Sequence, residues 1–125
     1  MINVVAACLT DGQKFLLCQR PAGKSRANCW EFPGGKIESE ETPEAAIVRE
    51  IQEELGITVL PEARLTSVNW NYPDVSIHLT LFRCRMTAGT PILIEHQAMA
   101  WVSYMEALSL DLAPADRALL KQLNF

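Results

Sequence analysis

Three glutamates in one short segment have the types and spacing to hold a divalent cation. Glu50, Glu53 and Glu54 are spaced i, i+3 and i+4, so in a helix their carboxylates project from one face within a single turn. Like charges this close destabilise a helix by about 0.2–0.5 kcal/mol per pair. A hard cation such as Mg²⁺ offsets that repulsion, because it takes oxygen ligands and carboxylates above all. The alternative is a solvated acidic face, which is the usual meaning of such a run.

The residues around these carboxylates predict the helix that presents them. Thr42 is a good N-cap, Pro43 suits the first helical position, and Gly56 stands where a left-handed C-cap belongs. Apolar residues at three- and four-residue steps predict a buried stripe along this helix, namely Val48, Ile51 and Leu55. The helix is therefore expected to pack one side on a core and to carry acidic groups on the other.

A longer pattern frames this helix. From Gly35 to Ile57 the chain reads GKIESEETPEAAIVREIQEELGI, which matches G-x5-E-x7-R-E-U-x-E-E-x-G-U, with U apolar, at every defined position. This is the Nudix box, so the chain resembles the Nudix hydrolases, and the stretches EFPGGKIE, ETPE and VREIQEELGIT resemble the MutT-type branch. The resemblance implies an α/β fold, an α/β/α sandwich on a mixed sheet. It also implies an enzyme that cleaves a nucleoside diphosphate linked to another moiety.

The same resemblance assigns a metal site and the catalytic carboxylates. The cofactor it implies is Mg²⁺, for which Mn²⁺ can substitute. The implied catalytic residues and side-chain ligands are Glu50, Glu53, Glu54 and a fourth carboxylate ahead of a later strand, Glu95. The Gly34 or Gly35 carbonyl is the implied backbone ligand, and either Glu95 or a glutamate of the box is the implied general base. The alternative for Glu95 is a solvated loop residue.

Four charged residues are expected to support this site. In the family, the pair that corresponds to Glu41 and Arg49 braces the loop against the helix and orients the ligands, so both are interpreted as structural support. Arg20 corresponds to a strand-end arginine that meets phosphate in MutT-type proteins, and Lys36 is a second candidate phosphate contact. The alternative for Arg20 and Lys36 is ordinary surface charge.

Asp116 marks a departure from the branch that cleaves 8-oxo-dGTP. That branch reads the purine edge with an asparagine, which donates and accepts, whereas an ionised aspartate only accepts. An acceptor suits the N1–H and 2-amino groups of guanine, or the 4-amino group of cytosine. A helix cap is the alternative role for Asp116. Phe32 and Tyr72 are predicted to stack on the base, unless they belong to the core.

These assignments predict the reaction (d)NTP plus water to (d)NMP plus diphosphate, with attack at the β-phosphorus. The leading substrate is 8-oxo-dGTP, which makes the predicted role cleansing of the nucleotide pool. The runner-up is CTP or a modified dCTP, because EHQA and LAPAD resemble the CTP pyrophosphohydrolase branch. A non-catalytic nucleotide sensor is a third hypothesis, and it has no need to retain Glu50, Glu53 and Glu54 together.

The remaining elements are predicted from local pattern. Strands are expected at residues 2–10, 14–20, 30–32, 57–59, 64–70, 76–86 and 98–102. Ser103 and Glu106 form a capping box for a brief helix, and Pro114 begins a last helix after a loop. Pro33-Gly34-Gly35 is expected to turn sharply or to approach a ligand, while turns are expected at 72–74 and 87–90.

Composition narrows the classes of protein. The chain has 125 residues, 49% of them apolar, and is expected to form a single domain over residues 1–125. Its four scattered cysteines argue against a zinc site or a disulfide framework and suit a reducing cytoplasm. A net charge of −4 without a basic stripe favours a small nucleoside triphosphate as partner over a nucleic acid polymer. No membrane partner is expected, because the opening MINVVAACL is apolar for too few residues to be a membrane segment. The expected state is a monomer or a homodimer.

Overall fold

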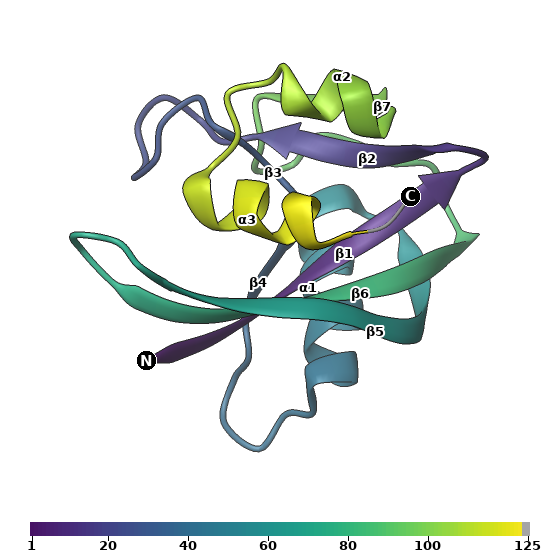
Figure 1. The fold of residues 1–125 in the computed structure, drawn as a ribbon. Coiled ribbons are helices and arrows are strands. Elements are labelled where there is room, and N and C mark those ends of the chain that lie inside the picture. Colours follow the sequence, from purple (N-terminus) through teal and green to yellow (C-terminus); the bar gives the residue numbers. More distant parts are fainter. Residues whose placement is uncertain (124–125) are drawn as a thin grey trace.

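The computed structural model describes residues 1–123, which fold around a seven-stranded mixed sheet (Figure 1). The strands are β1 (Ile2–Asp11), β2 (Lys14–Gln19), β3 (Trp30–Glu31), β4 (Gly34–Lys36), β5 (Thr58–Asn71), β6 (Ser76–Ala88) and β7 (Ala98–Val102). Their order is β3-β2-β1-β6-β5, with β4 also paired to β1 and β7 to β2. β1 and β6 run parallel, and the other pairs are antiparallel. The predicted sandwich on a mixed sheet is confirmed.

Two cores lie on opposite faces of β1, because successive side chains of a strand point to opposite sides. Val5, Ala7 and Leu9 pack in the core beneath helix α1 (Pro43–Leu55). Ala6 and Cys8 pack in the other core, which is closed by α2 (Tyr104–Leu108) and α3 (Pro114–Gln122). A strand covered on both faces reads as a continuous apolar run, which is why β1 contains VVAACL.

Helix α1 begins and ends where its capping residues predict. The Thr42 hydroxyl accepts a hydrogen bond from the Ala45 N–H at 3.1 Å, and Gly56 closes the helix with a left-handed φ of 68°. The buried side is broader than the predicted stripe. Its buried residues are Ala46, Ile47, Ile51, Glu54 and Leu55, while Val48 is only partly buried. Glu54 therefore belongs to the buried side and not to the solvated face.

The Gly34-Gly35 pair lies in a strand, which corrects the expected turn. Residues Gly34–Lys36 pair antiparallel with Val4–Ala6 of β1, and neither glycine has a positive φ. A Cβ on Gly34 would overlap the carbonyl oxygen of Val5, and a Cβ on Gly35 would overlap the carboxylate of Glu50. These glycines therefore permit a close approach of β1 on one side and of α1 on the other.

β5 is longer than predicted. Residues 57–59 and 64–70 were expected as separate strands, yet one strand runs over Thr58–Asn71 and passes through Pro61. The pairing with β6 shifts register between Pro61 and Ala63 and again between Arg64 and Thr66. β5 is an edge strand, where a proline and a bulge are tolerated, so the proline does not end the strand. The expected turn at 87–90 is also shorter, because β6 continues to Ala88.

The four cysteines are free thiols. Cys8, Cys18 and Cys84 are buried in the two cores, and only Cys29 is partly exposed. Burial raises the pKa of all three buried thiols, to about 11 for Cys8 and to about 12 for Cys84. These three thiols are therefore held in the neutral, unreactive form.

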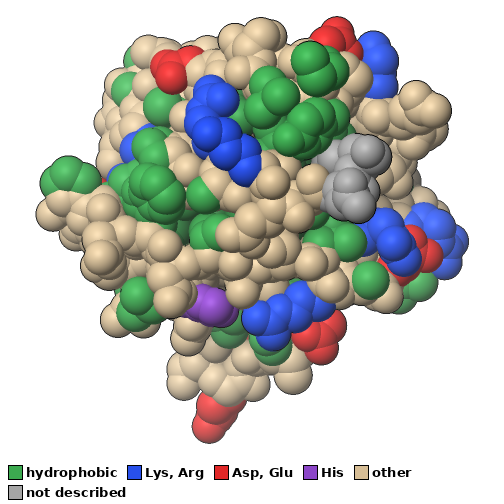
Figure 2. All heavy atoms as spheres, viewed as in Figure 1, with side chains coloured by type: hydrophobic (Ala, Val, Ile, Leu, Met, Phe, Trp, Pro, Cys, Tyr) green, Lys and Arg blue, Asp and Glu red, His purple; other side chains and the backbone are tan. Residues whose placement is uncertain are grey.

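The surface in Figure 2 mixes charges of both signs with apolar groups. On this face, lysine and arginine side chains form separate groups rather than one continuous stripe. Among residues 1–123, every helix is too short or too polar to span a lipid bilayer.

Candidate active site

Two adjoining cavities collect most of the predicted site residues. The larger cavity has a volume of about 470 Å³. Eight residues predicted to contact metal, phosphate or base line it, namely Arg20, Phe32, Gly34, Gly35, Lys36, Glu54, Tyr72 and Asp116. The smaller, of about 60 Å³, is lined by Glu95 and shares Arg20, Glu31 and Glu54 with the larger cavity. Glu41, Arg49, Glu50 and Glu53 line neither cavity.

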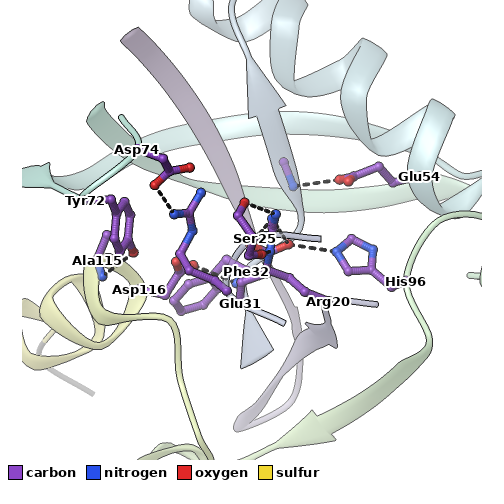
Figure 3. Close-up of polar contacts among 12 residues, drawn as sticks. Arg20, Ser25, Glu31, Phe32, Glu54, Tyr72, Asp74, His96, Ala115 and Asp116 are labelled. Atoms are coloured by element: carbon purple, nitrogen blue, oxygen red, sulfur yellow. Dashed lines mark hydrogen bonds and ion pairs between the residues drawn. The ribbon is translucent and has the colours of Figure 1, made fainter. Parts of the chain in front are cut away.

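Glu54 reaches from α1 to the start of β4. Its Oε1 accepts a hydrogen bond of 2.9 Å from the backbone N–H of Gly34 (Figure 3), and the residue is 6% exposed. Burial raises the pKa of Glu54 to about 9, and the negative charges of Glu31, Glu50 and Glu95 act in the same direction. A buried carboxyl with three acidic neighbours is poised to bind a cation when it ionises.

Glu50 lies one turn earlier, against Gly35. Its carboxylate occupies the space that a Cβ on Gly35 would fill, and Arg49 Nη1 donates a hydrogen bond to it at 2.8 Å. Burial raises the pKa of Glu50, which the Arg49 guanidinium partly opposes. Glu53 is half exposed and receives a longer contact of 3.3 Å from Arg49. Both carboxylates thus contact Arg49, and Glu50 also lies against Gly35 of β4.

Arg49 ties the loop before α1 to the helix. Its Nε and Nη2 donate to the two carboxylate oxygens of Glu41 at 2.7 and 2.9 Å, and Nη2 also donates to the Lys36 carbonyl at 3.0 Å. The hydrogen bond from Arg49 lowers the pKa of Glu41 to about 2. Arg49 therefore links the Glu41 loop and the Lys36 backbone to α1.

The donor set fits a hard divalent cation. Within residues 1–123, no three His, Cys, Asp or Glu side chains converge on one point. The charge of Glu95 nevertheless acts to raise the pKa of both Glu50 and Glu54, and the Gly34 and Gly35 backbone lies beside these two box glutamates. Oxygen donors with accumulated negative charge in a partly desolvated setting favour Mg²⁺ or Mn²⁺ over softer metals.

Arg20 and Lys36 place positive charge at the larger cavity. Arg20 Nε donates to the Ser25 carbonyl at 2.7 Å, and its Nη1 lies 3.3 Å from Glu31 Oε1. Lys36 is exposed at the end of β4. Both residues line the larger cavity.

Glu31 and His96 belong to the site and were missed by sequence reasoning. Glu31 lines both cavities and lies between Arg20 and His96, whose Nε2 is 2.9 Å from Glu31 Oε2 (Figure 3). His96 is buried. The only available signal was the position of Glu31 directly before Phe32-Pro33-Gly34, since a lone histidine carries no pattern.

Asp116 lies at the other end of the larger cavity. It is 6% exposed, and its Oδ2 accepts a hydrogen bond from the Phe32 N–H at 3.0 Å. Asp116 lies in the first turn of α3, whose N-cap is Ala113, and not in the loop that precedes this helix. Asp116 is therefore not a helix cap. Burial, and secondarily the charge of Glu31, raises the pKa of Asp116 well above its ordinary value.

The two aromatic residues predicted to stack on a base have protein partners. Phe32 is 3% exposed and stacks on Phe15 with ring centroids 5.5 Å apart, so it is mainly a core residue that also contributes to the cavity wall. The Tyr72 hydroxyl accepts a hydrogen bond from the Ala115 N–H at 2.9 Å, and the Arg26 guanidinium lies 4.0 Å from the centre of its ring. One face of Tyr72 is therefore already covered.

Arg26 also joins two loops beside the larger cavity. Its Nη1 lies 3.0 Å from Asp74 Oδ1 in the β5–β6 turn, 48 residues along the chain. Arg26 has a left-handed φ of 53°, which is uncommon for a residue with a side chain. The ion pair therefore holds the loop at 21–29 beside the turn at 72–74.

Comparison with known proteins places these features in a family. A family model described as NUDIX domain matches residues 1–123. The chain is 44% identical over 121 residues to the CTP pyrophosphohydrolase of Escherichia coli (strain K12), which covers 97% of this chain and 90% of that protein. It is 35% identical over 114 residues to the 8-oxo-dGTP diphosphatase of the same organism, which covers 91% and 88%. The crystal structure of the MutT protein from Methanosarcina mazei Go1 superimposes with a TM-score of 0.88 at 27% identity, covering 97% of this chain and 91% of that one.

Proposed function

The chain belongs to the Nudix family, and from that premise we propose that it is a nucleoside triphosphate pyrophosphohydrolase. It converts a (d)NTP and water into a (d)NMP and diphosphate. Nudix hydrolases generally need a divalent metal, and Mg²⁺ is the ion proposed here, with Mn²⁺ as a substitute. The observation that carries the proposal is the larger cavity, where the buried Glu54 of the box shares a wall with Arg20 and Lys36. A volume of about 470 Å³ suits a nucleotide-sized ligand.

Each proposed residue has a separate task. Glu50, Glu53 and Glu54, with the Gly34 or Gly35 carbonyl and Glu95, would hold the metal. When bound, such an ion neutralises phosphate charge and makes water more acidic. Arg20 and Lys36 orient the phosphate chain by charge-assisted hydrogen bonds.

The bond changes follow from attack at the β-phosphorus. The water oxygen bonds to that phosphorus, and the bond from the β-phosphorus to the oxygen bridging it to the α-phosphorus breaks. The nucleoside monophosphate leaves with the bridging oxygen. A carboxylate, either Glu95 or one of the box glutamates, accepts the proton of the attacking water.

The proposed first substrate is 8-oxo-dGTP. A relative that is 35% identical is named 8-oxo-dGTP diphosphatase, which supports this choice. The surroundings of Asp116 support it as well. Burial and the Glu31 charge favour the protonated form of Asp116, and a carboxylic acid donates from one oxygen and accepts at the other. The protonated Asp116 thus imitates the asparagine that reads a purine edge.

CTP or a modified dCTP is the second candidate. The relative that is 44% identical is named CTP pyrophosphohydrolase. An ionised Asp116, accepting from Phe32 with one oxygen, would have the other free to accept from the 4-amino group of cytosine. The two candidates therefore differ in the protonation state of one side chain.

A nucleotide panel tests the function. The protein is incubated with Mg²⁺ and 8-oxo-dGTP, dGTP, CTP, 5-methyl-dCTP, ADP-ribose or a dinucleoside polyphosphate, and products are separated by ion-exchange chromatography. We expect a monophosphate and diphosphate, with ¹⁸O from labelled water in the diphosphate. Dominant cleavage of ADP-ribose would contradict the proposal, and dominant cleavage of CTP would promote the second candidate.

A matched pair of variants tests the metal assignment. Glu53→Gln is expected to abolish turnover while the far-ultraviolet circular dichroism spectrum stays unchanged. Glu44→Gln, an exposed change in the first turn of the same helix, is expected to leave turnover intact. Near-normal activity of Glu53→Gln would refute the assignment of Glu53.

A further inference from the structure

His96 is buried beside the candidate active site and contacts one carboxylate there. Its side chain is 4% exposed, and its Nε2 lies 2.9 Å from Glu31 Oε2. Figure 3 shows the imidazole pointing at Glu31 from the segment that precedes β7. His96 thus joins a segment late in the chain to a residue of β3, 65 positions earlier.

The hydrogen-bonding pattern fixes which ring nitrogen donates. Within the described residues, His96 Nδ1 is buried and has no hydrogen-bond partner. A proton on Nδ1 would leave a buried donor unsatisfied, which is more costly than an unpaired acceptor. The favoured tautomer therefore carries its proton on Nε2 and donates to the Glu31 carboxylate.

Glu31 connects His96 to both ends of the site. It lines the two cavities and also pairs with Arg20. Its negative charge acts on Glu54 at the metal end and on Asp116 at the base end, because it raises the pKa of both. Glu31, the residue that His96 contacts, therefore lies at the centre of the site.

The segment that contains His96 also carries Glu95. The Ile92 N–H donates to the Leu55 carbonyl, and the Gln97 N–H donates to the Gln19 carbonyl, both at 3.0 Å. Between these anchors, in the part of the chain that the structure describes, positions 93–96 make one hydrogen bond, that of His96. Glu95 is exposed and makes no hydrogen bond or ion pair of its own within residues 1–123, so its neighbours determine its position.

We propose that His96 is a positioning residue, which by binding Glu31 fixes the segment at 92–97 so that Glu95 lies beside Glu50 and Glu54. This inference rests on the proposed function, because Glu95 is given a part in the reaction. In this role His96 acts through Glu31 and the segment at 92–97 and not on the reacting atoms. The position of Glu95 thereby depends on the contact between His96 and Glu31, and Glu31 lines the larger cavity.

A double-mutant cycle tests the inference. The variants are His96→Leu, His96→Gln, Glu95→Gln and the His96→Leu/Glu95→Gln double variant, assayed for kcat and KM on the preferred nucleotide of the panel. His96→Leu is expected to lower kcat by about tenfold with KM within about twofold, the size typical of residues that orient ligands. Adding His96→Leu to Glu95→Gln is expected to lower kcat no further, because position 95 then has no carboxylate for His96 to position.

Two comparisons separate positioning from general stability. His96→Gln keeps an amide donor near the position of Nε2 and is expected to recover most of the lost kcat. His78→Leu, a change at the partly buried histidine that contacts Asn69 on β5, is expected to leave kcat unchanged. If His96→Leu does not fold, His96→Asn makes the comparison, since its amide is too short to reach Glu31. A wild-type kcat in His96→Leu, or in His96→Asn where that variant replaces it, would overturn the inference. So would a loss of kcat in the double variant equal to the product of the two single losses.

A second readout does not depend on turnover. The rise in melting temperature produced by Mn²⁺ alone is measured for the same variants, and His96→Leu and Glu95→Gln are expected to reduce it to the same extent. An unreduced rise in His96→Leu would overturn the inference. A wild-type protein inert toward the whole panel would instead refute the proposed function, and the Mn²⁺ measurement would still decide the role of His96.

Discussion

Glu54 Oε1 accepts a hydrogen bond from the Gly34 backbone N–H, which joins the last turn of α1 to a residue 20 positions earlier. This contact carries a box carboxylate into the protein and aligns it with β4. It also leaves that carboxyl in surroundings where its ionised form is disfavoured without a cation.

The metal-free protein is expected to lose stability as the pH rises. The pKa of Glu54 is about 9 in the folded state against 4.5 ordinarily, so between these values the folded state binds a proton that the unfolded chain has released. The free energy of unfolding therefore falls across this window. Melting temperatures between pH 5 and pH 9 in EDTA should fall less in Glu54→Gln than in the wild type, and excess Mg²⁺ should flatten the wild-type curve. Parallel curves for the two proteins would contradict this.

Three glycines are expected to respond differently to alanine. Gly34→Ala drives a Cβ into the backbone of Val5 and should destabilise the protein by about 1–3 kcal/mol. Gly35→Ala meets only the Glu50 carboxylate, which can move, so it should lower kcat by about tenfold or more with a smaller loss of stability. Gly23→Ala is the control, because a Cβ at Gly23 would meet no atom within 4 Å. It should change neither stability nor kcat. Urea denaturation and steady-state kinetics measure both effects.

Arg49→Lys keeps the charge but loses the planar fork that binds Glu41, Glu50 and the Lys36 carbonyl. We expect a fall in kcat of about tenfold and a loss of about 1 kcal/mol in the free energy of unfolding. Arg64→Lys, at an exposed arginine whose side chain contacts Ser67, is the matched control and should be near neutral. Equal effects of the two substitutions would show that Arg49 contributes only charge.

Asp116→Asn separates the two candidate substrates. If protonated Asp116 reads 8-oxoguanine, the asparagine retains a donor and an acceptor, and kcat/KM for 8-oxo-dGTP should stay within about threefold. The ratio of variant to wild-type kcat/KM should then rise with pH, because only aspartate loses its donor on ionisation. Asp111→Asn, an exposed change before α3, is the control. A tenfold or greater loss confined to CTP would instead identify an ionised Asp116 that reads cytosine.

Local signals were enough to predict the elements that depend on them. Thr42 and Gly56 cap α1 as expected, and the Ser103–Glu106 capping box opens α2. Pro61 misled the prediction of β5, because pairing with β6 and a bulge at the sheet edge outweighed the local preference of proline.

The site was predictable only where a fixed spacing defines it. The box identified Glu50, Glu53 and Glu54 together, but not that Glu54 is buried against Gly34, since that depends on the pairing of β4 with β1. Glu31 and His96 lie 65 positions apart and meet only in the folded chain. A single acidic residue in a short strand and a single histidine before another carry no pattern that links them.

The distribution of thiols makes the native chain suitable for labelling beside its cavity. A maleimide fluorophore should attach once per molecule, at Cys29, because the other three thiols are enclosed in the two cores. Burial raises the pKa of Cys29 as well, so the coupling should quicken in mildly alkaline buffer. The Cys29 carbonyl accepts a hydrogen bond of 2.9 Å from the Arg20 N–H. A dye at this position would therefore act as a reporter of nucleotide arrival, without any engineered cysteine.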